Sequence, residues 1–219
     1  MPNGTSGKVL ALISGGIDSL PASYLTVKRG AKNIWLHFHS FPLVSKKSID
    51  KTKDLAKVFL NYQPGLKVYF FPFSEIQRAI KLKVLAKYRI LIYRRLMLKI
   101  AQEIARKENC LALVTGESLA QVSSQTLTNI NITEKATSCL ILRPLIGMDK
   151  EEIIKLAKKI KTFEISIKPQ EDCCTLFTPK HASAGADLKE IEKIEKQLNI
   201  EGLIKKSFQK IEKINYELL

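Results

Sequence analysis

Residues 8–19 read KVLALISGGIDS, and this stretch determines the fold that we expect. Residues 8–13 are a short apolar run, typical of a strand buried on both faces of a parallel sheet. A loop of serines and glycines follows, and then a helical pattern that Gly30 stops. Glycines let several backbone N–H groups approach one anion, and the next helix adds its positive dipole end. The stretch therefore predicts an anion-binding loop at the carboxyl end of the first strand.

Four further apolar runs follow, and helical patterns separate them. They lie at residues 33–38, 67–71, 111–114 and 139–142. Strands that alternate with helices predict an α/β fold, a doubly wound and mainly parallel five-stranded sheet. No linker or internal repeat interrupts the pattern. We therefore expect residues 1–219 to form one domain, with a helical C-terminal tail from about Asp187.

Two short motifs predict where helices begin. Ser74 with Gln77, and Asp149 with Glu152, have the spacing of a capping box, in which the first and fourth residues satisfy each other's backbone N–H groups. We expect Ser74 and Asp149 to be the caps and the helices to start directly after them.

The composition is that of a globular protein, with 45% hydrophobic and 26% charged residues. No apolar run approaches the ~20 residues that span a bilayer, and the N-terminus does not resemble a signal peptide. We therefore expect a cytoplasmic protein that has no membrane partner. The four cysteines have no CxxC spacing, which argues against a zinc or iron–sulfur site and for reduced thiols.

The net charge of +15 is concentrated in one region. Residues 46–107 contain sixteen Lys and Arg but only four acidic residues. Such a basic block suits a polyanion, and nucleic acid is the commonest one. The alternative is that these side chains are simply solvated on helix faces.

The loop itself narrows the type of phosphate site. It is neither a Walker A loop, because no lysine follows the glycines, nor a GxGxxG loop. The pattern SGGxDS resembles the pyrophosphate-binding loop of the PP-loop ATP-pyrophosphatase superfamily, which cleaves ATP between its α- and β-phosphates. The resemblance implies that ATP is bound by Ser14, Gly15, Gly16 and Ser19. Mg²⁺ would arrive with the ATP, and Asp18 is the candidate side chain to hold it or to order the loop.

Three further segments resemble the 4-thiouridine synthetase (tRNA sulfurtransferase) family. They are TGESLAQVSSQT at residues 115–126, LRPLI at residues 142–146 with Asp149 and Lys150, and EDCCTLFTP at residues 171–179. The resemblance covers nearly the whole chain. It implies ATP-dependent sulfur transfer to uridine in tRNA, which forms 4-thiouridine through an adenylated intermediate and a cysteine persulfide.

The same resemblance implies further nucleotide-site residues, namely Leu12, Ile13, His37, Phe38, Arg94, Gly116 and Gln125. We expect the backbone of His37 to matter more than its ring. Two readings of the ring stay open: a hydrogen-bonded core group, or a side chain with a role in the site. Arg94 lies beside Arg95 on a predicted basic helix, so it could instead face solvent or RNA. Gln125 could be an amide on a helix surface.

The resemblance implies that Cys173 is the catalytic thiol, which receives a persulfide or closes a disulfide during sulfur release. This chemistry needs an accessible thiolate. Asp172 would not lower the pKa of this thiol, so its activation must come from other groups. Cys174 is a candidate resolving thiol. Cys110 and Cys139 adjoin predicted strands, and we expect both to be buried core residues.

The sequence also departs from the family pattern. Only seven residues precede the first strand, so we expect the family's THUMP region to be absent. A separate THUMP-containing chain could then bind the RNA, or the basic block at residues 46–107 could do part of that work. We likewise expect no rhodanese domain, so that a cysteine desulfurase or another persulfide donor supplies the sulfur. Two alternatives stay open: a PP-loop ATP pyrophosphatase with another acceptor, and a non-catalytic nucleotide-binding module.

Overall fold

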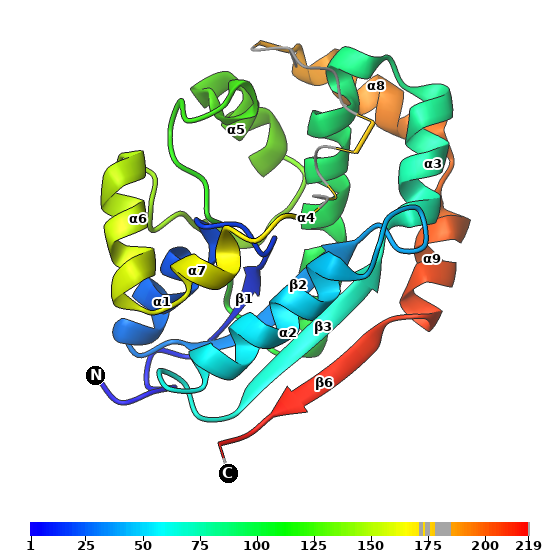
Figure 1. The fold of residues 1–219 in the computed structure, drawn as a ribbon. Coiled ribbons are helices and arrows are strands. Elements are labelled where there is room, and N and C mark those ends of the chain that lie inside the picture. Colours follow the sequence, from blue (N-terminus) through cyan, green and yellow to red (C-terminus); the bar gives the residue numbers. More distant parts are fainter. Residues whose placement is uncertain (171–172, 174–175, 178–184, 219) are drawn as a thin grey trace.

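The computed structural model describes residues 1–170, 173, 176–177 and 185–218, and in this part of the chain six strands form one sheet with helices on both faces (Figure 1). The strands lie in the order β5-β4-β1-β2-β3-β6. Their bounds are β1 (Lys8–Leu12), β2 (Lys32–His39), β3 (Leu66–Pro72), β4 (Ala112–Val114), β5 (Leu140–Leu142) and β6 (Glu212–Tyr216).

The helices connect these strands in the expected alternation. They are α1 (Ser19–Lys28), α2 (Lys47–Phe59), α3 (Ser74–Lys83), α4 (Arg89–Lys107), α5 (Leu127–Glu134), α6 (Lys150–Lys159), α7 (Phe163–Ser166), α8 (Leu188–Leu198) and α9 (Glu201–Gln209), with 3₁₀ turns η1 (Ala86–Tyr88) and η2 (Ser123–Gln125). No helix in the described residues is long and apolar enough to cross a membrane.

The central five strands are parallel, so their carboxyl ends lie at one edge of the sheet. Side chains alternate between two apolar layers. Leu10 and Leu36 belong to the layer that contains α3 and α4, whereas Ala11 and Trp35 belong to the layer that contains α1 and α2. Strands buried on both faces read as continuous apolar runs. The predicted doubly wound α/β fold is confirmed.

The prediction of five strands, with a tail that is only helical, is wrong at the last segment. Residues 212–216 form β6, which pairs antiparallel with β3 so that Ile214 lies opposite Val68. Ile214 and Tyr216 pack against the apolar core, while Asn215 between them is exposed. This strand covers what would otherwise be the open edge of β3. Five residues of alternation are too few to separate an edge strand from the end of a helical pattern.

The two predicted capping boxes have different outcomes. The box of Asp149 and Glu152 is present at the start of α6. The box at Ser74 is absent, because α3 begins one residue earlier than expected, with Phe73 in the capping position and no side-chain cap. The N–H of Phe73 still bonds to His39 of β2, and its carbonyl accepts the first helical bond, from the N–H of Gln77. The sheet therefore runs directly into α3.

Part of the basic block of residues 46–107 is paired with acidic groups of the same molecule. Arg95, of which 2% of the side chain is exposed, lies between Glu195 of α8 and the carbonyl of Ile132. Lys99 shares the carboxylate of Glu195, and Lys67 pairs with Glu108. These three basic side chains thus join α4 to its neighbours.

Candidate active site

A cavity of about 340 Å³ opens at the carboxyl ends of β1, β2 and β4. Most of the predicted site residues line it, although they come from distant parts of the sequence. They are Leu12, Ile13, Ser14, Asp18, Ser19, Phe38, Arg94, Gly116, Gln125 and Cys173. Gly15, Gly16 and His37 lie beside the cavity and are not among its lining residues.

The loop between β1 and α1 has the conformation that an anion site needs. Gly15 has a φ of 81°, in the left-handed region that favours glycine. The Oγ of Ser14 accepts a hydrogen bond from the N–H of Gly16 at 3.2 Å, and α1 begins without a side-chain cap. The uncapped start of a helix directs N–H groups and positive dipole toward a bound anion.

Two segments distant in sequence fix the back of this loop. The Nε2 of Gln170 donates to the carbonyl of Ser14 at 2.9 Å. The Nζ of Lys51, from α2, donates to the carbonyl of Ser166 at 3.0 Å and to that of Lys168. A Cβ added to Gly15 would lie 2.9 Å from the Oε1 of Gln170. The segment after α7 therefore packs directly against the loop.

Asp18 joins three elements at the mouth of the cavity. Its Oδ1 is 2.7 Å from the Nζ of Lys150 in α6, and its Oδ2 accepts a hydrogen bond of 3.0 Å from the Nε2 of Gln121. In the described part of the chain, no cluster of three His, Cys, Asp or Glu side chains could hold a metal ion. The contacts of Asp18 are those of a residue that orders the loop.

Gly116 brings the segment after β4 against the start of α1. A Cβ at this position would lie 3.0 Å from the carbonyl carbon of Asp18 and 3.0 Å from the nitrogen of Ser19. Both contacts are with backbone, which cannot move aside as a side chain can. A larger residue would therefore push the two segments apart by a few tenths of an ångström.

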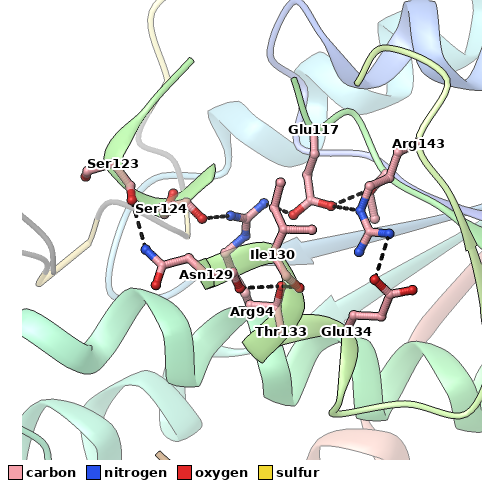
Figure 2. Close-up of polar contacts among 10 residues, drawn as sticks. Arg94, Glu117, Ser123, Ser124, Asn129, Ile130, Thr133, Glu134 and Arg143 are labelled. Atoms are coloured by element: carbon pink, nitrogen blue, oxygen red, sulfur yellow. Dashed lines mark hydrogen bonds and ion pairs between the residues drawn. The ribbon is translucent and has the colours of Figure 1, made fainter. Parts of the chain in front are cut away.

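Glu117 is the centre of a buried ion-pair network beside the cavity (Figure 2). One carboxylate oxygen pairs with Arg94, and the other is 2.7 Å from the Nε of Arg143 and 3.0 Å from the hydroxyl of Thr115. Burial alone would raise the pKa of Glu117, but the guanidinium groups of Arg94 and Arg143 hold this pKa below its ordinary value. Arg143 also reaches Glu134 of α5, at 3.3 Å.

The network orients Arg94 toward the cavity. Its second nitrogen donates to the carbonyl of Ser124 at 2.9 Å, so the guanidinium bridges α4 and the segment at residues 117–125 (Figure 2). Asn129 of α5 holds the carbonyl of Ser123 in the same way, at 2.9 Å. Arg94 thus lines a partly buried site and is not a solvent-facing arginine.

The ring of His37 is a hydrogen-bonded core group, one of the two readings that the sequence left open. Its Nδ1 is 2.8 Å from the carbonyl of Ile13, and its Nε2 is 3.3 Å from the hydroxyl of Ser48. Burial lowers the pKa of His37 to about 4. The hydrogen bond to the carbonyl of Ile13 acts in the opposite direction, but its effect is smaller. The adjacent Phe38 points into the cavity instead, because successive residues of a strand face opposite sides of the sheet.

Cys173 is the described cysteine that reaches the cavity, with 6% of its surface exposed. Its carbonyl accepts a hydrogen bond of 2.7 Å from the Nε2 of Gln77. Cys174 lies outside the described residues. Cys110 and Cys139 are only partly buried against the core, and burial, with Glu108 nearby, raises the pKa of Cys110 to about 11.

Several residues of this site have no role in the sequence analysis. They are Glu117, Gln121, Arg143 and Lys150, which hold Arg94 and Asp18 in place. All four lie within or beside the motifs at residues 115–126 and 142–150. Glu117 follows β4 and Arg143 follows β5, which are neighbouring parallel strands. An acid and an arginine in such positions are a sequence signal for a buried ion pair.

Comparisons with known proteins give a consistent picture. The sequence matches the family described as thiamine biosynthesis protein (ThiI) over residues 4–200. A relative from Thermus thermophilus, named probable tRNA sulfurtransferase, is 46% identical over 99% of this chain and 53% of its own length. One from Moorella thermoacetica with the same name is 43% identical over 99% of this chain and 56% of its own. The chain thus spans about half the length of the curated relatives it matches.

Solved structures agree on the fold. A crystal structure described as a 4-thiouridine synthetase–RNA complex with bound ATP matches 99% of this chain and 57% of that chain, with a TM-score of 0.93 and 36% identity. The structure of NMN synthetase from Francisella tularensis matches 87% of this chain and 77% of that chain, with a TM-score of 0.58 and 16% identity, and this likeness concerns the fold alone.

Proposed function

The chain belongs to the ThiI family, and from this premise we propose that it is the ATP-using catalytic unit of a tRNA sulfurtransferase that forms 4-thiouridine. One observation carries the proposal. The 340 Å³ cavity brings together the SGGxDS loop, the segment at residues 115–126 and the thiol-bearing Cys173. An anion-binding loop and a thiol in the same cavity are what adenylation followed by sulfur transfer requires.

ATP would lie with its phosphates on the loop at residues 14–19. The loop amides and the start of α1 would hold the pyrophosphate. Leu12, Ile13 and Phe38 would line the pocket for the base, and Gly116, Arg94 and Gln125 would complete it. The likeness to a structure described with bound ATP supports this placement.

Mg²⁺ would come with the phosphates and would neutralise charge that develops on the leaving pyrophosphate. Both carboxylate oxygens of Asp18 already have partners, Lys150 and Gln121. A metal here would be held mainly by phosphate oxygens, with Asp18 as a carboxylate available to it and as the residue that orders the loop.

The chemistry has three steps. The O4 of uridine attacks the α-phosphorus of ATP, so that pyrophosphate leaves and O4 becomes an adenylate. The terminal sulfur of a persulfide on Cys173 then attacks C4, and the C4–O4 bond breaks to release AMP. The sulfur–sulfur bond must also be cleaved, and the candidate thiol for that step is Cys174. The product is 4-thiouridine, with Cys173 left in a disulfide that a reductant reopens.

Two partners follow from this chemistry. A cysteine desulfurase or another persulfide donor would load Cys173. A THUMP-containing unit would contribute RNA binding, because Lys67, Arg95 and Lys99 of the basic block at residues 46–107 already have partners within the molecule. The site of action would be the cytoplasm, where newly made tRNA is modified.

A reconstituted reaction tests the proposal. The chain is incubated with ATP, Mg²⁺, cysteine, a desulfurase and unmodified tRNA, with and without a THUMP-containing protein. Nucleoside mass spectrometry measures 4-thiouridine, and pyrophosphate, the product of adenylation, is measured in parallel. Cys173→Ser is expected to form pyrophosphate without 4-thiouridine, whereas Cys139→Ser, the matched control, keeps both. Formation of pyrophosphate without 4-thiouridine in every reaction of the unaltered chain would refute the assigned acceptor.

A further inference from the structure

Gln77 makes a contact that its position in the helix does not explain. It lies in the first turn of α3, where its spacing from Ser74 predicts a helix cap. The structure uses the side chain elsewhere, because Nε2 donates at 2.7 Å to the carbonyl of Cys173, 96 residues further along the chain. Gln77 is fully buried, and Cys173 is 6% exposed.

The chemistry of this contact fixes the orientation of the amide. A carbonyl oxygen accepts hydrogen bonds, so only the NH₂ end of the Gln77 side chain can face Cys173. The Oε1 is then left buried, with no hydrogen-bond partner within the described residues. A buried acceptor without a hydrogen bond lowers the stability of the fold. If position 77 served only for packing, an apolar side chain would be more stable there.

The anchor that carries Gln77 is rigid. Ile76 and Ile80 of the same helix are fully buried, and α3 packs against α4. Gln77 is not among the residues that line the cavity, whereas Cys173 is. The amide of Gln77 therefore connects α3 to the backbone of Cys173 from outside the cavity.

We propose that Gln77 is a positioning residue for Cys173, which holds the carbonyl of that cysteine so that its thiol stays at the cavity. The inference rests on the proposed function in one respect, the assignment of Cys173 as the sulfur carrier. It predicts that replacing Gln77 changes the reactivity of the Cys173 thiol and leaves the reaction with ATP unchanged. That separation distinguishes a positioning role from general support of the fold.

The first test does not depend on the proposed activity. Gln77→Met keeps the length and burial of the side chain but removes the donor. Alkylation of Cys173 by iodoacetamide is followed by peptide mass spectrometry on the folded chain, with Cys139 as internal reference. We expect the rate at Cys173 to rise about tenfold, which corresponds to about 1.4 kcal/mol. An unchanged rate would overturn the proposal.

Gln63→Met is the matched control. Gln63 is also fully buried, and its amide also bonds to backbone, with Nε2 donating to the carbonyl of Asn33 at 2.8 Å. It joins β2 to the segment before β3, away from Cys173. We expect no change in alkylation of Cys173 in this variant. An equal rise would mean that losing any buried amide loosens the site, and the specific role of Gln77 would be rejected.

A second variant guards against misfolding. Gln77→Glu has the same shape but presents an acceptor to the carbonyl, and we expect alkylation to rise at least as much as in Gln77→Met. If neither variant unfolds cooperatively on heating, Gln77 is a core residue and not a positioning one, and the proposal fails.

The functional arm uses the reconstituted reaction. In Gln77→Met we expect 4-thiouridine per pyrophosphate to fall about tenfold, while the rate of pyrophosphate formation in the first turnover is unchanged. A parallel loss of both products would contradict the proposal. If the unaltered chain makes no 4-thiouridine, the proposed function fails on its own, and the alkylation experiment still decides the role of Gln77.

Discussion

Replacing Glu117 with glutamine removes one negative charge from the centre of the Arg94–Glu117–Arg143 network and leaves the shape of the side chain unchanged. The carboxylate side chain is 7% exposed, and those of Arg94 and Arg143 are 17% and 12% exposed. Breaking a buried pair typically costs 3–5 kcal/mol, because the partner charge stays desolvated. Arg94 keeps the carbonyl of Ser124, and Arg143 keeps Glu134. We therefore expect a loss of about 2–4 kcal/mol in the free energy of unfolding.

The same substitution should weaken nucleotide binding. The guanidinium of Arg94 lines the cavity, and the charged bond to Glu117 holds it there. A hydrogen bond to a charged group contributes about 1.5–3 kcal/mol. Loss of part of that restraint predicts about tenfold weaker binding of a non-hydrolysable ATP analogue, measured by calorimetric titration. Urea denaturation followed by circular dichroism measures the change in stability.

Glu195 provides a control for this experiment. Its side chain is also 7% exposed, and it also bridges two cations, Arg95 and Lys99, but outside the cavity. Glu195→Gln should lose comparable stability and bind the analogue as the parent does. The reasoning is refuted if Glu117→Gln binds the analogue with parental affinity, or if both variants lose affinity equally.

The pH dependence gives an independent check on Glu117. Its pKa in the folded chain is lowered, so its contribution is present above the ordinary value of 4.5 and is lost as the pH falls through the folded value. The difference in stability between the parent and Glu117→Gln should therefore narrow below pH 4.5. A difference that stays constant to pH 3 would show that the carboxylate charge is not the source of the effect.

Three further predictions concern single positions. Gly116→Ala places a methyl group 3.0 Å from the backbone of Asp18. It should lower the free energy of unfolding by about 1–3 kcal/mol and weaken nucleotide binding. Gly147→Ala has nothing within 4 Å of the added atom, so it should change neither quantity in the same urea denaturation and calorimetric titration. His37 has a folded pKa of about 4 against 6.5, so the unfolded chain alone binds its proton as the pH falls from 6.5 to 4. His37 should thereby lower the free energy of unfolding by about 3 kcal/mol over that interval, measured by urea denaturation at each pH as the difference between the parent and His37→Asn; His39, whose pKa burial also lowers to about 4, adds its own fall in both proteins. Asp149→Ala removes the capping box of α6 and should lower the unfolding free energy by about 1 kcal/mol without changing nucleotide affinity.

Local patterns were sufficient where one segment determines its own structure. The apolar run at residues 8–13 and the glycines after it predict the strand, the loop and the helix. The capping box at Asp149 likewise depends only on residues within one turn. In each case the interactions that decide the conformation lie close together in the sequence.

Long-range contacts determine the features that the sequence analysis missed. Ser74 and Gln77 satisfy the local rule for a capping box, but the bond from Phe73 to His39 extends the sheet and moves the helix start. Edge pairing determines β6, because its alternating residues need the free side of β3 as a partner. Neither partner can be read from the segment itself.

The site shows the same division. The motifs predict which residues meet at the cavity, because carboxyl ends of parallel strands share one edge. They do not show how these residues are held. Arg94 depends on Glu117, 23 residues away, and Asp18 depends on Lys150, 132 residues away. Charge counting was misleading for Arg95, which is buried against Glu195 and not offered to a polyanion.

The pairing of β6 with β3 also has a consequence during synthesis. The β3 strand leaves the ribosome roughly 140 residues before β6, which at about 5–20 residues per second is a delay of about 10–30 s. Throughout that interval the nascent chain has an open strand edge, rich in Tyr and Phe, that another copy can pair with. A chaperone that shields this edge, or slower growth at lower temperature, should raise the yield of folded protein. Variants that weaken β6 should lower that yield before they affect any property of the mature molecule.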